Sequence, residues 1–139
     1  MPSLRILTPA APPPTAGTAP YSGHGLILFA DDEPPIRALA TSMLEQLGHT
    51  VITACDGLEA VAACRSRHYG LVLMDCQMPE MDGFEATRTI RADESAGRHT
   101  PIVALTANAM DGDRERCLAA GMDDYLAKPV TATALRAIV

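Results

Sequence analysis

Aromatic residues are scarce in this 139-residue chain, which has no Trp, two Phe and three Tyr. A core built on aromatic rings is therefore excluded, but 47% of the residues are hydrophobic, enough for an aliphatic core in one domain. Basic residues are also few, since 11 Lys and Arg stand against 17 Asp and Glu. The resulting net charge of −6 argues against direct binding of nucleic acid, which needs a basic patch.

The four cysteines form no C-x-x-C pair and no Cys/His spacing suited to zinc; they are Cys55, Cys64, Cys76 and Cys117. They are expected to pack as small apolar residues in a reducing compartment. No apolar run approaches the ~20 residues of a membrane span, and prolines interrupt the N-terminus too early for a signal peptide. We therefore expect a cytoplasmic domain without membrane contact of its own, which is compatible with a membrane-anchored parent protein.

Residues 1–25 differ in composition from the rest of the chain. Six of the eleven prolines fall within residues 2–20, mixed with Ala, Thr, Ser and Gly. Such a stretch cannot bury enough apolar surface to fold, so it is predicted to be an extended, disordered linker. A linker at this place suggests an attached neighbour upstream and leaves residues 26–139 as the folded domain.

Residues 26–139 alternate between short apolar runs and helical periods. The five runs are Leu26–Ala30, Val51–Ala54, Leu71–Met74, Ile102–Leu105 and Tyr125–Ala127. They are continuous rather than alternating, as is typical of parallel strands that are covered on both faces. Five strand–helix repeats predict an α/β fold with an open, five-stranded parallel sheet and helices on both faces.

Apolar residues recur with the helical period between the runs. In the first helix they share one predicted buried face: Ile36, Leu39, Ala40, Met43, Leu44 and Leu47. Leu58, Phe84 and Met110 begin the periods of the next three helices. The fifth helix is predicted to begin near Thr131 and to be cut short at Val139.

Polar side chains follow four of the five predicted strands, at the point where each run ends. They are Asp31, Asp32 and Glu33 after the first run, Asp75 after the third, Thr106 after the fourth, and Lys128 with Pro129 after the fifth. The second run ends in a plain turn. Ligands bind beyond the carboxyl ends of such strands, where the strand order reverses. A strand order of 2-1-3-4-5 would bring these side chains together between strands one and three.

The chemistry of this set is that of phosphoryl transfer. Three carboxylates in one pocket repel each other, and a divalent cation with oxygen ligands, Mg²⁺, Mn²⁺ or Ca²⁺, removes the repulsion. A lysine ammonium can pair with the oxygens of a transferring phosphoryl group, and a threonine hydroxyl can donate to one of them. An aspartate can act as the nucleophile and carry an acyl phosphate.

Three segments resemble response-regulator receiver domains of two-component signalling. They are ADDEPPIR at residues 30–37, LVLMDCQMPEMDGFEATRTIR at 71–91 and PIVALTANAMDGDRERCLAAGMDDYLAKPV at 101–130. The resemblance covers about Leu26 to Val139 with the motifs in their expected order. It implies the flavodoxin-like receiver fold. The segments QMPEMDGFEATR and ALTANAM are most similar to the corresponding segments of receivers inside hybrid sensor histidine kinases.

The resemblance implies a phosphoacceptor and a metal site. Asp75 matches the phosphoacceptor and also a metal ligand. Asp32 matches the direct metal ligand, and Asp31 matches the acid that holds the metal's waters. The backbone carbonyl of Gln77 matches the third protein ligand. The implied cofactor is Mg²⁺, for which Mn²⁺ can substitute.

The resemblance also implies a conformational switch. Thr106 matches the hydroxyl that moves toward the phosphoryl group, and Lys128 matches the lysine that pairs with the acyl phosphate. Pro129 matches a proline whose peptide bond is usually cis. Tyr125 matches the aromatic residue whose rotamer reports phosphorylation, and Ala107 matches the small residue that leaves room for this movement.

The implied partners are a histidine kinase domain, a histidine phosphotransfer protein, or both. The receiver then catalyses its own phosphorylation and dephosphorylation as a module of a hybrid kinase. A stand-alone single-domain response regulator is the alternative. A flavin-binding module is disfavoured because no Ser/Thr/Gly-rich phosphate loop follows the first strand. A pseudo-receiver is disfavoured because the acidic set is complete.

Several polar residues have simpler interpretations. Asp82 and Gly83 are predicted to form a turn and the start of a helix rather than to take part in the chemistry. Arg114 and Arg116 on the fourth helix are expected to be solvent-exposed. No partner is predicted for any of the four histidines, which are His24, His49, His68 and His99.

Overall fold

The computed structural model describes residues 25–95, 97–107 and 112–139. The predicted linker therefore lies outside the described residues except for Gly25, and so does Met110 of the predicted fourth helix. The strands are β1 Leu26–Ala30, β2 Thr50–Ala54, β3 Leu71–Asp75, β4 Ile102–Thr106 and β5 Asp124–Ala127. The helices are α1 Pro34–Gln46, α2 Gly57–Ser66, α3 Gly83–Asp93, α4 Asp113–Ala120 and α5 Ala132–Ile138.

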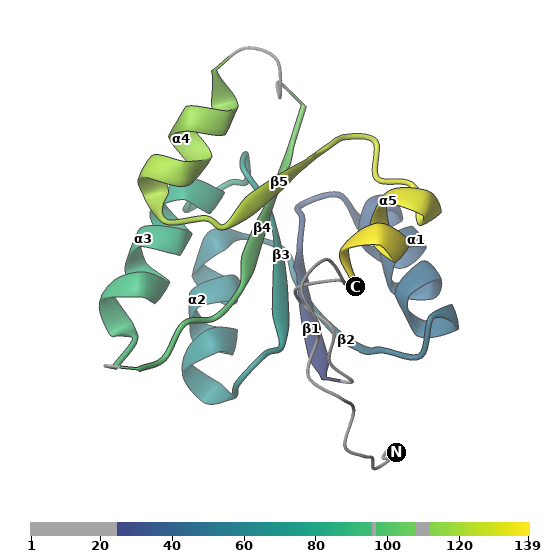
Figure 1. The fold of residues 1–139 in the computed structure, drawn as a ribbon, viewed down its shortest axis with the longest axis horizontal. Coiled ribbons are helices and arrows are strands. Elements are labelled where there is room, and N and C mark those ends of the chain that lie inside the picture. Colours follow the sequence, from purple (N-terminus) through teal and green to yellow (C-terminus); the bar gives the residue numbers. More distant parts are fainter. Residues whose placement is uncertain (1–24, 96, 108–111) are drawn as a thin grey trace.

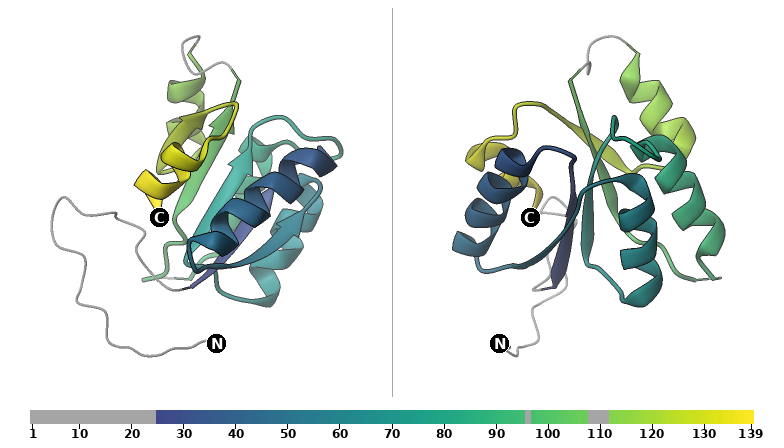
Figure 2. Two further views of the ribbon diagram at one scale, coloured as in Figure 1. Left: turned by 90° about the vertical axis from the view of Figure 1, so that its right-hand side faces the viewer. Right: turned by 180° about the vertical axis from the view of Figure 1, so that it is seen from behind.

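All neighbouring strands are parallel and the sheet order is β2-β1-β3-β4-β5, which confirms both the predicted class and the predicted order. Helices α1 and α5 cover one face of the sheet, and α2, α3 and α4 cover the other (Figures 1 and 2). The strand order reverses at the β1–β3 pair, since β2 lies outside β1 and β4 lies outside β3. This pair therefore marks the crevice in which a ligand of such a sheet is expected.

The central strands are buried along their whole length, and successive side chains on them point to opposite faces. Leu28, Val72 and Met74 pack under α2, α3 and α4. Phe29, Leu73 and Leu105 pack under α1 and α5. The two aliphatic layers hold the strands rigidly on both sides, so the residues at the strand ends have fixed positions.

Part of the predicted burial on the helices is wrong. Ala40 and Leu44 are buried on α1, but Leu39 is 55% exposed. Leu58, at which the helical period of α2 begins, is also 50% exposed. Each helix packs against a single sheet face, so its buried stripe is narrow, and Leu39 lies about 100° around the helix axis from Ala40.

Strand and helix ends carry polar contacts that fix the chain's path. Asp56 and Asp82 accept hydrogen bonds from the backbone N–H groups of Glu59 and Glu85, each at 2.8 Å, and so cap α2 and α3. This confirms the structural role predicted for Asp82. Thr131 caps α5 in the same manner. Among the described residues, no helix is long and apolar enough to cross a membrane.

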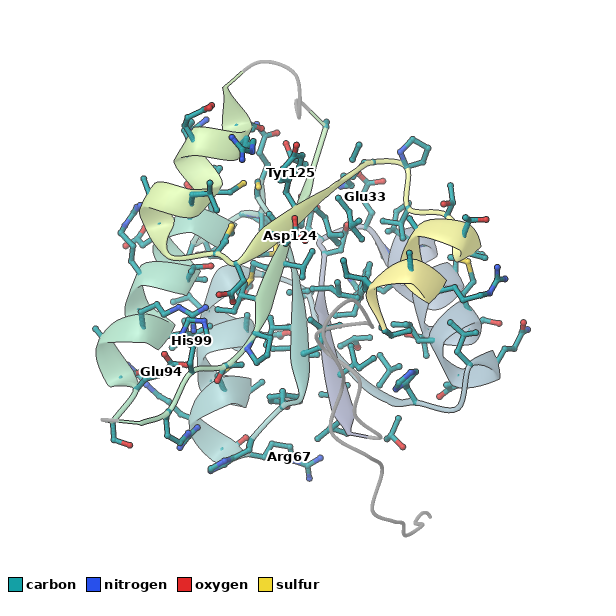
Figure 3. The ribbon with its side chains drawn as sticks, viewed as in Figure 1. Glu33, Arg67, Glu94, His99, Asp124 and Tyr125 are labelled. Atoms are coloured by element: carbon teal, nitrogen blue, oxygen red, sulfur yellow. The ribbon has the colours of Figure 1, made fainter. Side chains whose placement is uncertain are left out.

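An arginine joins α3 to the start of β5. Arg91 donates to the carbonyl oxygens of Gly121 and Thr100 and pairs with Asp123 at 2.9 Å. His99 Nε2 lies 2.6 Å from the other oxygen of Asp123, beside the group labelled Glu94 in Figure 3. The expectation that His99 has no partner is therefore wrong, because the fold brings together two residues that are far apart in sequence.

The contrast between two leucines of α1 gives a test of this packing. Leu44→Ala should lower the free energy of unfolding by about 2–5 kcal/mol, because it leaves a cavity under a fully buried side chain. Leu39→Ala should change it by no more than about 0.5 kcal/mol, because Leu39 is largely in solvent. Urea denaturation of both variants measures the difference. Equal losses would show that α1 presents a different face to the sheet.

Candidate functional site

The predicted site residues come together at the carboxyl edge of the sheet. Asp31 follows β1, Asp75 ends β3, Thr106 ends β4 and Lys128 follows β5. A cavity of about 470 Å³ opens at this edge. Its lining consists of Asp32, Glu33, Asp75, Cys76, Gln77, Met78, Pro79, Thr106, Ala107, Asp113 and Lys128. Figure 3 shows Glu33 on the same side of the molecule as Tyr125 of β5.

Three carboxylates converge beside this cavity. Asp31, Asp32 and Asp75 each offer an oxygen atom, and these atoms all lie within 4.8 Å of one another. Asp31 and Asp75 are buried, whereas Asp32 is exposed. The guanidinium of Arg37 donates to the backbone carbonyl of Asp31 at 2.8 Å, which fixes the start of the acidic segment.

One buried carboxylate oxygen in this cluster lacks a hydrogen-bond donor. Asp31 Oδ1 accepts from the backbone N–H of Glu33 at 2.9 Å. Asp31 Oδ2 is fully buried and has no hydrogen bond from any described residue, although Lys128 Nζ lies at an ion-pair distance of 3.3 Å. An oxygen of this kind, next to two more carboxylates, suits a hard divalent cation or the water bound to one. The residues present therefore fit a Mg²⁺ site.

Lys128 connects two of the acids. Its Nζ atom lies 3.3 Å from Asp75 Oδ2 and 3.3 Å from Asp31 Oδ2. Burial works against its charge, but Asp75 and Asp31 outweigh burial and raise the pKa of Lys128. Its backbone N–H donates to the Thr106 carbonyl at 2.8 Å, and the following peptide bond to Pro129 is cis, as the resemblance implies.

The electrostatics of the cluster act most strongly on Asp75. Burial, followed by the negative charge of Asp31, raises the pKa of Asp75 from 3.8 to about 6. The Gln77 backbone N–H, 3.2 Å from Asp75 Oδ1, and Lys128 act in the opposite direction. The folded domain thus makes the charged form of Asp75 less favourable than it is in water, and added positive charge would reverse this.

A glycine allows the chain to turn closely behind Asp75. A Cβ atom on Gly83 would lie only 2.1 Å from the backbone oxygen of Asp75, so no other residue fits there without moving β3. The Gly83 N–H donates to the carbonyl of Cys76 at 3.0 Å. The Asp82–Gly83 turn is therefore a structural support of the site, although it makes no contribution to the cavity lining.

The predicted switch residues occupy the β4–β5 side of the site. Thr106 is 1% exposed, and Ala107 is exposed and lines the cavity. Tyr125 pairs in register with Ala104 and packs, half-buried, against the aliphatic layer under α2, α3 and α4. Asn108, which follows Ala107 and could influence hydrolysis, lies outside the described residues.

One acidic residue of the cavity was not predicted from the sequence. Asp113, the first residue of α4, is 6% exposed and lines the cavity together with Asp75. Thr106 Oγ1 donates a hydrogen bond of 2.5 Å to Asp113 Oδ2. An acidic residue at a helix start is usually explained by capping, so no sequence signal distinguishes Asp113 as a site residue.

A doubly wound parallel sheet with an acidic cluster and a lysine at its switch point defines a class of phosphoryl-accepting signalling domains. The family model of the response regulator receiver domain matches residues 27–139, and the chain belongs to that family. It is the receiver domain of a two-component phosphorelay.

The relatives agree with this assignment. The chain is 42% identical to the sensor protein GacS of Pseudomonas syringae over 91% of its own length and 14% of that protein. It is 41% identical to histidine kinase 1 of Arabidopsis thaliana, over 75% of this chain and 11% of that one. The chain thus spans a small part of these relatives, one a sensor protein and the other a histidine kinase.

Solved structures show the same fold. The magnesium-bound receiver domain of the sensor histidine kinase PA1611 from Pseudomonas aeruginosa is 46% identical, with a TM-score of 0.74, covering 82% of this chain and 93% of that one. A co-crystal structure of the yeast phosphotransfer protein Ypd1 with the receiver domain of Ssk1, from Saccharomyces cerevisiae, matches with 31% identity and a TM-score of 0.72. That match covers 80% of this chain and 83% of that one.

The raised pKa of Asp75 predicts a specific pH dependence of the metal-free domain. Folding raises this pKa from 3.8 to about 6, so the folded state binds a proton that the unfolded state has released between these values. The extra free energy of unfolding that comes from this bound proton is therefore complete below about pH 4, and it is lost as the pH rises through about 6. In EDTA, Asp75→Asn should be more stable than the wild type by up to about 3 kcal/mol at pH 7.5, and nearly equal to it at pH 4.

Denaturation at several pH values measures this difference. Glu45→Gln, which removes an exposed carboxylate on α1, is the control and should follow the wild-type profile. If the free energies of unfolding of Asp75→Asn and of the wild type change in parallel between pH 4 and 7.5, Asp75 is not the group whose pKa is raised by folding.

Proposed function

We propose that the domain accepts a phosphoryl group on Asp75 and that Asp31, Asp32, Thr106 and Lys128 support the transfer. The observation that carries this proposal is the position of Asp75. It is buried at the switch point of the sheet, faces a cavity, and is flanked by two acids and one lysine. A nucleophilic carboxylate, a cation site and a fixed ammonium are the components that phosphoryl transfer requires.

Mg²⁺ is the proposed cofactor, with Mn²⁺ as a substitute. Asp32 and Asp75 would hold the ion directly through carboxylate oxygens, Asp31 would hold its waters through the orphaned Oδ2, and Gln77 would provide its backbone carbonyl. The magnesium ion in the cleft of the PA1611 receiver supports this assignment. When bound, the ion neutralises the acids and the charge on the phosphoryl oxygens.

The transfer itself is a displacement at phosphorus. An Asp75 carboxylate oxygen forms a bond to phosphorus while the bond from phosphorus to the donor's imidazole nitrogen breaks, and the nitrogen keeps the electron pair. Lys128 already lies 3.3 Å from Asp75 Oδ2, so it is placed to pair with the negative acyl phosphate that results. Thr106 can then donate its hydroxyl hydrogen to a phosphoryl oxygen.

The switch is proposed to pass from Thr106 to Tyr125. Thr106 ends β4 and Tyr125 lies in β5, and these two strands are neighbours in the sheet. Movement of Thr106 toward the phosphoryl group would leave space that an inward rotamer of Tyr125 can occupy, so that the surface of α4 and β5 changes. This coupling would report the state of Asp75 to a partner.

The parent protein is proposed to be a hybrid histidine kinase, since the curated relatives are histidine kinases, a sensor protein and a hybrid signal transduction protein, and this chain matches 6–15% of their length. The donor is then a histidine kinase domain, and the acceptor is a histidine phosphotransfer protein. The Ypd1–Ssk1 co-crystal structure supports such a partner. The stand-alone response regulator is the alternative and is not favoured by these relatives.

Labelling with a small phosphoryl donor tests the proposed chemistry. Incubation of the 139-residue chain with acetyl phosphate and Mg²⁺ should add one phosphoryl group, and EDTA should prevent this. Asp75→Asn should remain folded but unlabelled, because the amide cannot act as the nucleophile. Intact-mass spectrometry gives the stoichiometry, and Asp93→Asn is a control that alters an exposed aspartate outside the cavity. Stoichiometric labelling of Asp75→Asn would contradict the assignment.

A second experiment addresses the partner. The domain, charged with radiolabelled phosphate, should pass its label to a histidine phosphotransfer protein of the same genome within seconds to minutes. The expected docking surface includes α1, the helix that follows the acidic segment, on which Ile36 is half-buried and Leu39 is 55% exposed. Leu39→Glu should slow this transfer but leave labelling by acetyl phosphate unchanged. Loss of label only as free phosphate would favour the stand-alone alternative.

A further inference from the structure

We infer that Asp113 is a positioning residue, which holds the Thr106 hydroxyl away from Asp75 until a phosphoryl group is attached there. This inference rests on the proposed function of Asp75. The hydrogen bond from Thr106 Oγ1 to Asp113 Oδ2 is 2.5 Å long and lies between two buried residues, 1% and 6% exposed. Hydrogen bonds to a carboxylate are stronger than neutral ones, and burial protects this one from water.

The hydroxyl of Thr106 has a single hydrogen and can donate it to one acceptor at a time. In the structure that acceptor is Asp113. A phosphoryl oxygen on Asp75 would need the same hydrogen. Since Asp75, Thr106 and Asp113 line the same cavity, the two acceptors compete for one donor within one site. The Asp113 bond therefore sets how readily Thr106 can turn toward the phosphoryl group.

Comparison with the starts of α2, α3 and α5 shows that Asp113 is not an ordinary cap. The carboxylates of Asp56 and Asp82, and the hydroxyl of Thr131, each accept from a backbone N–H three residues further on. The capping position of α4 is instead Gly112, which offers no side chain. Asp113 follows Gly112 and lines the cavity, and its carboxylate accepts a hydrogen bond from the side chain of Thr106 at the end of β4.

Asp113 also connects the site to α3. Its second oxygen lies 3.4 Å from Arg116 Nη1, and the Arg116 guanidinium lies 4.4 Å from the centre of the Phe84 ring on α3. When Thr106 leaves, Asp113 keeps Arg116 as a partner but has lost its buried donor, and it faces a phosphoryl group of the same charge. The start of α4 is then expected to shift outward, which carries the signal to the α3–α4 surface.

The test measures the rate of labelling by acetyl phosphate and Mg²⁺ in the full chain. Asp113→Ala should raise the rate about tenfold, equivalent to about 1.4 kcal/mol of barrier, because Thr106 no longer has to leave a bound acceptor. The gain should appear in kcat and leave KM for acetyl phosphate within twofold. Glu115→Gln removes a charge from the same helical turn on a side chain that is 74% exposed, and should leave the rate unchanged.

A double-mutant cycle separates positioning from charge repulsion. In a Thr106→Ala background, Asp113→Ala should have no effect, because no hydroxyl remains to be held. An equal acceleration in that background would mean that Asp113 only repels the donor, and would overturn the inference. An unchanged or lower rate in Asp113→Ala alone would also overturn it.

A second variant covers the case in which Asp113→Ala fails to fold. Asp113→Asn keeps the size of the side chain and a weaker, neutral acceptor, so it should raise the rate about threefold. Its Thr106 methyl NMR signal, without phosphoryl donor, should move toward the position seen in the wild type with beryllofluoride and Mg²⁺. A signal that remains at the free wild-type position would contradict the inference. Absence of labelling in the wild type would instead overturn the proposed function and the inference with it.

Discussion

Repulsion between two buried carboxylates, Asp31 and Asp75, is the constraint on which the rest of the site depends. Both side chains are almost inaccessible to water, and the metal-free domain offsets their charge with one ammonium, Lys128, at 3.3 Å from each. Burial, together with the charge of Asp31, outweighs this single cation and raises the pKa of Asp75 to about 6. The site is therefore suited to a divalent cation, whose binding would lower the pKa of Asp75 and further stabilise the charged form that can attack phosphorus.

Such an unfavourable arrangement persists because the sheet imposes it. Asp75 is the last residue of a strand that is buried on both faces, and the close approach of Gly83 to its backbone oxygen prevents β3 from relaxing. Lys128 is tied to the carbonyl of Thr106 through its own backbone N–H. The aliphatic layers on the two faces thus supply the stability that holds like charges together.

The sequence was sufficient to predict the fold and the residues that end the strands. Continuous apolar runs predict buried parallel strands directly. A parallel sheet then places Asp31, Asp75 and Lys128 at one edge, independently of the conformation of the loops. Side-chain environments on the helices were harder to predict. Leu39 satisfies the helical period but lies at the flank of the stripe, and the His99–Asp123 pair depends on a tertiary approach that spacing cannot reveal.

Asp113 was missed for a related reason, and its place explains how a site built on repulsion can also act as a switch. Asp113 is a third buried acid near the cavity, but unlike Asp31 and Asp75 it accepts a hydrogen bond from the Thr106 hydroxyl and pairs with Arg116 rather than with Lys128. A phosphoryl group on Asp75 would carry more negative charge than the carboxylate it replaces. It can therefore withdraw the hydrogen of Thr106 from Asp113 and leave that acid buried beside a like charge. The same repulsion that calls for a metal ion at one side of the cavity would then drive α4 to move at the other.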